Sequence, residues 1–166
     1  MSDLQNFKFL IESGNLEELK NLYKKGILTR EVAIEQNENL LFGYACYEGK
    51  LEICKWLYKT FKITKEEVSE YCNSPFQYAV CGGKLEVCQW LHETFYITKE
   101  EIMSDYNYTF FYACENDHYN IISFLCNTLG ITEDYVKNVI KHYSEEKQEK
   151  ILDCLVPLGS FSKSAK

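Results

Sequence analysis

The chain repeats itself with a period of 34 residues, and this periodicity constrains the fold more than any other feature of the sequence. Segments 42–75 and 76–109 match without a gap at just over half of their positions. Both begin with Phe-x-Tyr-Ala and continue with Gly-Lys-Leu-Glu-x-Cys-x-Trp-Leu. A match of this length predicts a repeat protein in which each unit buries its apolar face against the next.

Two further units extend the array. A third copy of the pattern begins at Phe110, and the N-terminal segment fits at an offset of 35 residues. The predicted repeats are therefore about 1–35, 36–69, 70–103 and 104–143. Four units exceed the three or so that a stacked array needs for stability.

The apolar spacing within a unit is helical. Leu51, Cys54, Leu57 and Tyr58 are spaced as on one face of a helix, and a shorter helix before them ends at Gly49. The segments 64–67 and 98–101 both read Thr-Lys-Glu-Glu, a capping box that predicts the start of a third, short helix. Each unit is thus predicted to be helix, turn, helix and helical connector, which makes the chain an all-α solenoid.

The C-terminal segment departs from the repeat. Residues 144–156 are rich in Glu and Lys with a few apolar positions, a composition that suits an end cap with one polar face. We predict a single repeat domain over residues 1–158, including a cap at 144–158, and a disordered tail at 159–166.

Two stretches of the repeat resemble a known family. Ser-Pro-Phe-Gln-Tyr-Ala at 74–79 resembles the Thr-Pro-Leu-His-x-Ala that opens an ankyrin repeat, and Gly-Lys-Leu-Glu-Val-Cys at 83–88 resembles the Gly-His-x-Glu-Val-Val that opens its second helix. The Trp-Leu-Tyr, Phe-x-Ile-Thr and Ala-Cys elements are similar to ankyrin-like repeats abundant in giant viruses of amoebae. The resemblance implies binding of a protein partner, a host protein if the chain is viral.

The sequence departs from that family at one place. The Gly-Ala-Asp-x-Asn stretch that forms the hairpin finger of a standard ankyrin repeat is absent, and Phe-Lys-Ile-Thr-Lys-Glu-Glu stands at 61–67 instead. We therefore expect a helix in place of the finger.

Composition excludes several other classes of function. The formal net charge is −7 and no basic stripe is visible, which opposes binding to nucleic acid or to an anionic membrane surface. No apolar run reaches the length of a transmembrane helix, and the first residues lack the pattern of a secretory signal. We expect a monomeric, cytoplasmic protein, located in the host cytoplasm if it is viral.

The eight cysteines do not indicate a metal site. There is no Cys-x-x-Cys pair, and the three histidines are scattered, so no metal, cofactor or catalytic residue is predicted. The cysteines at 46, 54, 88 and 114 recur at apolar repeat positions and are predicted to lie in the core. Trp56, Trp90 and Phe124 share one repeat position and are interpreted as packing residues rather than as a ligand cage.

Recognition is expected at positions that the repeat leaves variable, which line the concave groove in ankyrin repeats. Nine residues on the short first helices and their preceding turns are the candidates for partner binding: Tyr47, Glu48, Tyr71, Asn73, Cys81, Tyr106, Asn107, Glu115 and Asn116.

Two alternatives to a protein-binding module with this concave site remain open. The chain could be a small-ligand sensor or an enzyme that uses thiols and His92 in a pocket between repeats. It could also be an adaptor whose C-terminal helices, within 134–156, dock a second partner.

Overall fold

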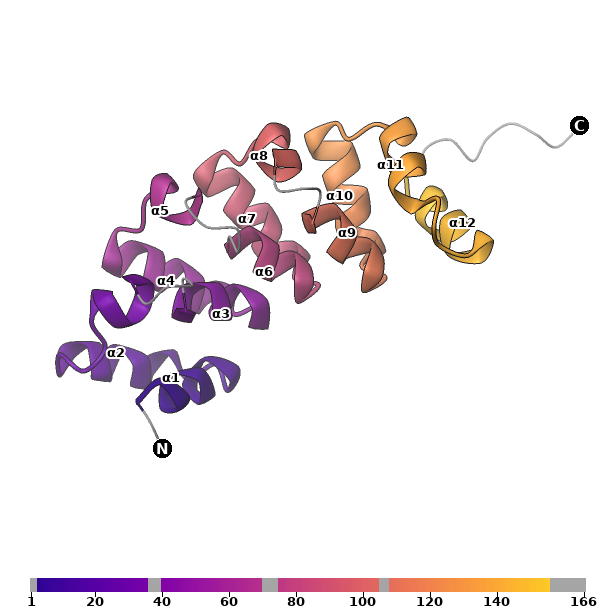
Figure 1. Ribbon diagram of the computed structural model, residues 1–166. Helices are drawn as coiled ribbons and strands as arrows, with labels where there is room; N and C mark the ends of the chain where they lie inside the picture. Colours follow the sequence, from indigo (N-terminus) through magenta and orange to yellow (C-terminus); the bar gives the residue numbers. More distant parts are fainter. Residues whose placement is uncertain (1–2, 36–39, 70–74, 105–107, 156–166) are drawn as a thin grey trace, which may run out of the picture. The chain divides into compact units, whose positions relative to one another are not determined.

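The computed structural model describes residues 3–35, 40–69, 75–104 and 108–155, and these residues are all-helical without a strand (Figure 1). This confirms the predicted fold class. The chain divides into two compact units, unit 1 at 1–97 and unit 2 at 98–166. The single domain expected over 1–158 stays a prediction.

Unit 1 consists of helix pairs joined by short connectors. Its helices are α1 (Asp3–Glu12), α2 (Leu16–Lys24), the π-helical turn η1 (Glu31–Glu35), α3 (Leu40–Glu48), α4 (Leu51–Phe61), α5 (Lys65–Ser69), α6 (Pro75–Cys81) and α7 (Leu85–Phe95). Unit 2 contains α8 (Lys99–Ser104), α9 (Tyr108–Glu115), α10 (Tyr119–Leu129), α11 (Glu133–Ile140) and α12 (Glu145–Asp153). We call α1, α3, α6 and α9 the first helices and α2, α4, α7 and α10 the second helices.

The predicted capping boxes form in both connectors that carry them. The backbone N–H of Glu67 donates to Oγ1 of Thr64 at 3.4 Å, and the Thr64 N–H donates to the Glu67 carboxylate at 2.9 Å. Thr98 and Glu101 repeat this exchange at 3.2 and 2.7 Å. Each box satisfies backbone donors that the start of a short helix leaves unpaired. A helix therefore stands in place of the ankyrin finger, as predicted.

Helix α4 confirms the helical spacing predicted for Leu51, Cys54, Leu57 and Tyr58. In α4 the buried side chains include Ile53, Cys54 and Phe61, whereas Leu51 and Tyr58 are only half-buried. The buried side of α4 therefore covers a broader arc than a single i, i+3, i+7 row.

Aromatic side chains join neighbouring second helices. Tyr23 of α2 meets Trp56 and Phe61 of α4 edge to face, with ring centroids 6.1 and 5.6 Å apart. One repeat later, Tyr58 meets Trp90 and Phe95 in the same way, at 5.9 and 5.4 Å. The tryptophans are thus packing residues between repeats, as predicted, and such edge-to-face pairs stabilise the stack beyond the burial of their area.

Glycines allow the first helices α3 and α6 to approach closely. A Cβ on Gly82 would lie 3.0 Å from the carbonyl carbon of Tyr47 and nearer still to its oxygen, while a Cβ on Gly43 would lie 2.8 Å from the ring of Tyr78. Figure 1 shows α1, α3 and α6 side by side in one layer, with α2, α4 and α7 in a second layer.

Each connector is tied to the following repeat by a basic side chain. Lys65 Nζ donates to the carbonyl of Tyr96 at 3.3 Å, and Lys99 Nζ donates to the carbonyl of Gly130 at 2.9 Å. Tyr96 and Gly130 are the left-handed C-cap residues of α7 and α10. A cation at these helix ends is favoured by the partial negative charge of the unpaired carbonyls.

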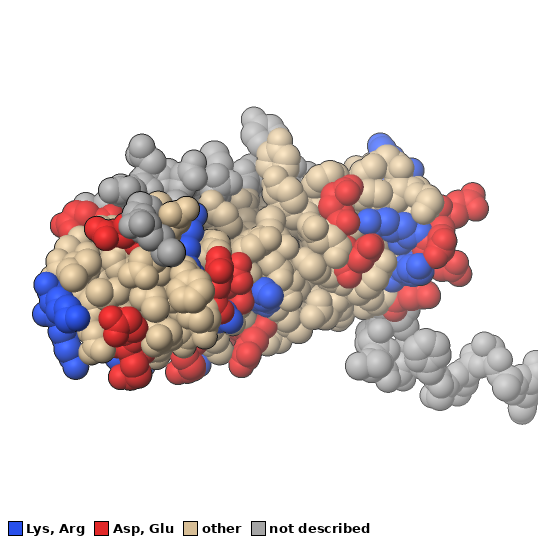
Figure 2. Space-filling view, turned by 90° about the horizontal axis from the view of Figure 1, so that it is seen from below, with Lys and Arg blue, Asp and Glu red and all other residues tan. Residues whose placement is uncertain are grey.

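Helix α12 spans residues 145–153, within the segment 144–158 that was expected to form the cap. Oγ of Ser144 caps its start by accepting from the N–H of Lys147 at 3.4 Å, and Ile151 is fully buried. Basic and acidic side chains are interspersed over α11 and α12 (Figure 2), where Lys150 pairs with Glu146 at 2.6 Å. The expected tail at 159–166 lies outside the described residues.

Candidate functional site

The candidate site of each unit is the side of its first helices that faces away from its second helices. In α3, Phe42, Ala45 and Cys46 are buried, so side chains two positions after Phe42 and one or two after Cys46 lie on the opposite side. We call this side the first-helix face. In unit 1 it comprises Phe9, Glu12, Tyr44, Tyr47, Glu48, Tyr78 and Cys81, and in unit 2 it comprises Tyr108, Tyr112, Glu115 and Asn116.

An aromatic residue recurs at one position of this face in all four repeats. Phe9, Tyr44, Tyr78 and Tyr112 are equivalent positions, and none of them is buried. Phe9 is 61% exposed and Tyr112 is 38% exposed. Tyr44 and Tyr78 are half-buried, and the Tyr78 ring lies beside Gly43 of α3. An aromatic side chain that keeps part of its surface exposed at the same position of every repeat marks a candidate contact surface.

Lys8 and Glu12 of α1 bracket Tyr44 of α3. The Tyr44 hydroxyl donates to the Glu12 carboxylate, and Lys8 Nζ lies 5.1 Å from the centroid of the Tyr44 ring. The bond to Glu12, followed by burial and the negative charge of Glu48, raises the pKa of Tyr44 above its ordinary range. The phenol therefore stays protonated and acts as a donor. With Tyr47, which is 42% exposed, these residues form the Tyr44 cluster: Lys8, Glu12, Tyr44, Tyr47 and Glu48.

Aromatic side chains at the surface of unit 2 also stack. The rings of Tyr108 and Tyr112 are 6.1 Å apart and nearly parallel, and Phe111 stacks on His142 at 6.3 Å. Rings already paired in this way present a rigid apolar surface, since little further side-chain freedom is lost on binding.

The nine predicted residues fall into three groups. Tyr47, Glu48 and Cys81 lie together, because Tyr47 borders the close approach of α3 and α6; Cys81 is half-buried. Glu115 and Asn116 are exposed in unit 2 at the end of α9. The remaining predicted residues lie outside the described part of the chain: Tyr71, Asn73, Tyr106 and Asn107.

The end of α9 is partly covered by the cap. Lys147 Nζ donates to the carbonyl of Glu115 at 3.3 Å and pairs with the Asp117 carboxylate at 3.2 Å. Oδ1 of Asp117 also accepts from the Tyr119 hydroxyl, and both donors, Tyr119 first, lower the pKa of Asp117. The cap thus fixes the turn that carries Glu115 and Asn116.

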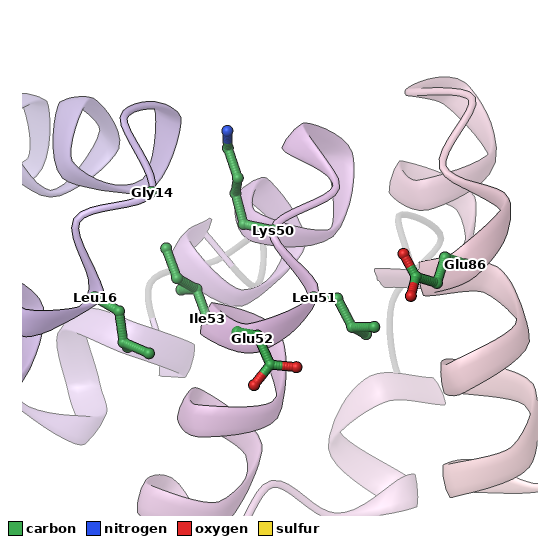
Figure 3. Close-up of a pocket in the computed structure, with 7 residues that line it drawn as sticks. All are labelled: Gly14, Leu16, Lys50, Leu51, Glu52, Ile53 and Glu86. Carbon is green, nitrogen blue, oxygen red and sulfur yellow. The ribbon is translucent and has the colours of Figure 1, made fainter.

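A shallow groove of about 310 Å³ crosses the first turns of α2, α4 and α7 in unit 1 (Figure 3). Leu51 and Glu86 face each other across it, and the Lys50 side chain points away along its rim. Its lining consists of Gly14, Leu16, Lys50, Leu51, Glu52, Ile53 and Glu86. It contains none of the nine predicted residues and neither cysteine nor histidine, so it does not provide the alternative Cys/His pocket.

The surroundings of the cysteines and of His92 indicate that these residues maintain the fold. Cys46 and Cys54 are fully buried with their sulfur atoms 3.7 Å apart, and burial raises the pKa of Cys88 to about 12. Nδ1 of His92 is hydrogen-bonded to the carbonyl of Ile97 at 2.9 Å. The predicted core positions of the cysteines are confirmed, and a buried thiol with a raised pKa is a poor nucleophile. Among the described residues no group of three or more His, Cys, Asp and Glu side chains could hold a metal ion.

The aromatic position shared by Phe9, Tyr44, Tyr78 and Tyr112 was missed in the sequence-based prediction, which concentrated on variable residues. A signal was present. The core positions of each first helix follow an i, i+3, i+4 pattern, and an aromatic residue recurring at i+2 cannot join that core. A repeated aromatic residue away from the buried side indicates a repeated exposed surface.

These features define an all-α repeat protein with helix–turn–helix units, helical connectors and an exposed face on its first helices. The family model described as "Ankyrin repeats (3 copies)" matches residues 42–138, more than half of the chain. The chain therefore belongs to the ankyrin repeat family. No curated protein and no solved structure matches it. Within the described residues, no helix has the length and apolar character needed to cross a membrane.

Proposed function

We propose that this protein is a non-enzymatic interaction module that binds a protein partner through the first-helix face. Ankyrin repeats are generally protein–protein interaction modules, and one observation supports this face as the contact surface. All four first helices carry a partly exposed aromatic side chain at the same position, outside the set of fully buried core residues. Aromatic residues contribute much of the binding energy at protein interfaces.

The origin and the compartment of the partner are part of this proposal. The repeat style resembles ankyrin-like repeats of giant viruses of amoebae, which supports a host protein as the partner and the host cytoplasm as the place of contact. This resemblance is the support for both the origin and the compartment of the partner.

Affinity capture with a matched pair of variants tests the proposal. Phe9→Ser combined with Tyr47→Ser removes two exposed rings from the first-helix face of unit 1. Tyr96→Ser removes a ring that is 79% exposed but lies at the end of α7, away from this face. The wild-type chain and the variants are immobilised and incubated with host-cell lysate, and the captured proteins are identified by mass spectrometry.

We expect the double variant to lose the captured proteins and Tyr96→Ser to retain them. Unfolding curves that coincide with that of the wild type would exclude loss of the fold as the cause. Equal capture by all three chains would refute the first-helix face as the binding surface.

A further inference from the structure

The first helices carry an unequal distribution of charge. Their described residues include four carboxylates, at Asp3, Glu12, Glu48 and Glu115, and a single basic residue, Lys8. The second helices of unit 1 mix both signs: α2 carries two lysines and two glutamates, α4 two lysines and one glutamate, and α7 two glutamates. The first-helix face thus carries Glu12, Glu48 and Glu115 beside its aromatic side chains, and Lys8 is the one basic residue in the described first helices.

The Tyr44 cluster shows which chemistry this face accommodates. Lys8 Nζ already lies 5.1 Å from the Tyr44 ring centroid, within the range of a cation–π interaction. The hydroxyl of Tyr44 donates to the Glu12 carboxylate, and the negative charge of Glu48 acts on the same residue. A cation over a ring with carboxylates beside it is the environment that lysine and arginine side chains prefer at interfaces.

We infer that the segment docking on the Tyr44 cluster is positively charged, with a lysine or arginine side chain placed between the rings of Tyr44 and Tyr47 and the carboxylate of Glu48. This inference rests on the proposed function and specifies its partner. Charge complementarity supports it, since a chain of net charge −7 attracts a cationic segment. Lys8 is the internal counterpart of the partner's cation and competes with it for the Tyr44 ring.

A random library of 12-residue peptides displayed on phage tests the inference, with the full-length chain as bait. Bound phage are counter-selected against the double variant Tyr47→Ser and Glu48→Gln. The inference predicts that the peptides dependent on these two residues are enriched in lysine and arginine. Their binding should also weaken steeply as the salt concentration rises.

Calorimetric titration with one enriched peptide provides a sharper measurement. Glu48→Gln is expected to weaken binding by about fivefold, and Lys8→Gln to strengthen it because the Tyr44 ring loses its internal cation. Lys25→Gln, at the exposed end of α2, changes the net charge by the same amount and should alter affinity by less than about twofold. A gain equal for Lys8→Gln and Lys25→Gln would overturn the proposed site on the ring.

Other outcomes separate this inference from the proposed function. Enriched peptides that depend on Tyr47 and Glu48 but are neutral or acidic would overturn the cationic partner and leave the first-helix face intact. Peptides that bind the double variant equally well would overturn both. Self-association of the chain in sedimentation that disappears in the double variant would identify the occupant as a second copy, and would overturn a separate cationic partner.

Discussion

Replacing Gly82 by alanine should destabilise unit 1 because α3 and α6 are too close for a side chain at this position. The new Cβ would lie 3.0 Å from the carbonyl carbon and 3.2 Å from the Cα of Tyr47. These are backbone atoms, so no side-chain rotation relieves the contact and the two helices must separate. Overpacking of this kind costs about 3 kcal/mol, and the lower chain entropy of alanine offsets about 1 kcal/mol of it.

The expected net loss is therefore about 2 kcal/mol in the free energy of unfolding. Urea unfolding followed by tryptophan fluorescence measures it for unit 1 specifically, because the two tryptophans of the chain, Trp56 and Trp90, both lie there. The midpoint should fall by about 1 M urea.

Gly43→Ala is the matched control on the same helix pair. Its Cβ would lie 2.8 Å from the ring of Tyr78, which is a side chain and can move aside. We expect a change of less than about 1 kcal/mol for this variant. A Gly82→Ala protein as stable as the wild type, or a loss no larger than that of Gly43→Ala, would refute the argument from backbone contact.

Three further predictions concern the connectors and the core. Tyr96→Gly should stabilise unit 1 by about 0.5–1 kcal/mol in the same urea assay. Tyr96 has φ 51° and is 79% exposed, so glycine relieves the strain of the left-handed backbone and loses little packing. A destabilised variant would contradict this prediction. Partial burial opposes ionisation of Glu67, but its bond of 2.6 Å to Arg30 holds the pKa of Glu67 below its ordinary value. At pH values above the ordinary glutamate pKa, the Arg30–Glu67 pair should therefore stabilise the fold by about 0.5 kcal/mol. This contribution should disappear as the pH falls through the lowered pKa of Glu67. Glu67→Gln should remove that part of the pH dependence of unfolding, and an unchanged profile would argue against the pair. Burial raises the pKa of the Cys46 and Cys88 thiols. When the chain is labelled with a thiol reagent at pH 8 and the labelled positions are mapped by mass spectrometry, both cysteines should react only at the rate of local or global unfolding. Fast labelling of the native chain would contradict their core positions.

Much of the fold could be predicted because its signals are local or periodic. Thr64 and Glu67 are three residues apart, so their capping box can be recognised in the sequence without knowledge of the tertiary structure. The recurrence of cysteine at 54 and 88 predicted a buried position, because a residue that repeats with the stack has the same neighbours in each repeat.

The candidate site was predicted only in part. Tyr47 and Glu48 were identified from their variability between repeats, and the structure places them beside Tyr44. The cluster that Tyr44 forms with Lys8 and Glu12 was not foreseen, because it depends on which side chains of α1 reach across to α3.

The sequence by itself determined the period, the helix–turn–helix unit and the capped connector that replaces the ankyrin finger. Contacts between repeats join residues about one period apart and follow from the distance and angle between helices, which no local pattern encodes. Only the tertiary structure decided that Gly82 lies against the Tyr47 backbone and that Lys65 bonds to the carbonyl of Tyr96. Repetition fixes what each unit is, and packing decides which side chains of successive units meet.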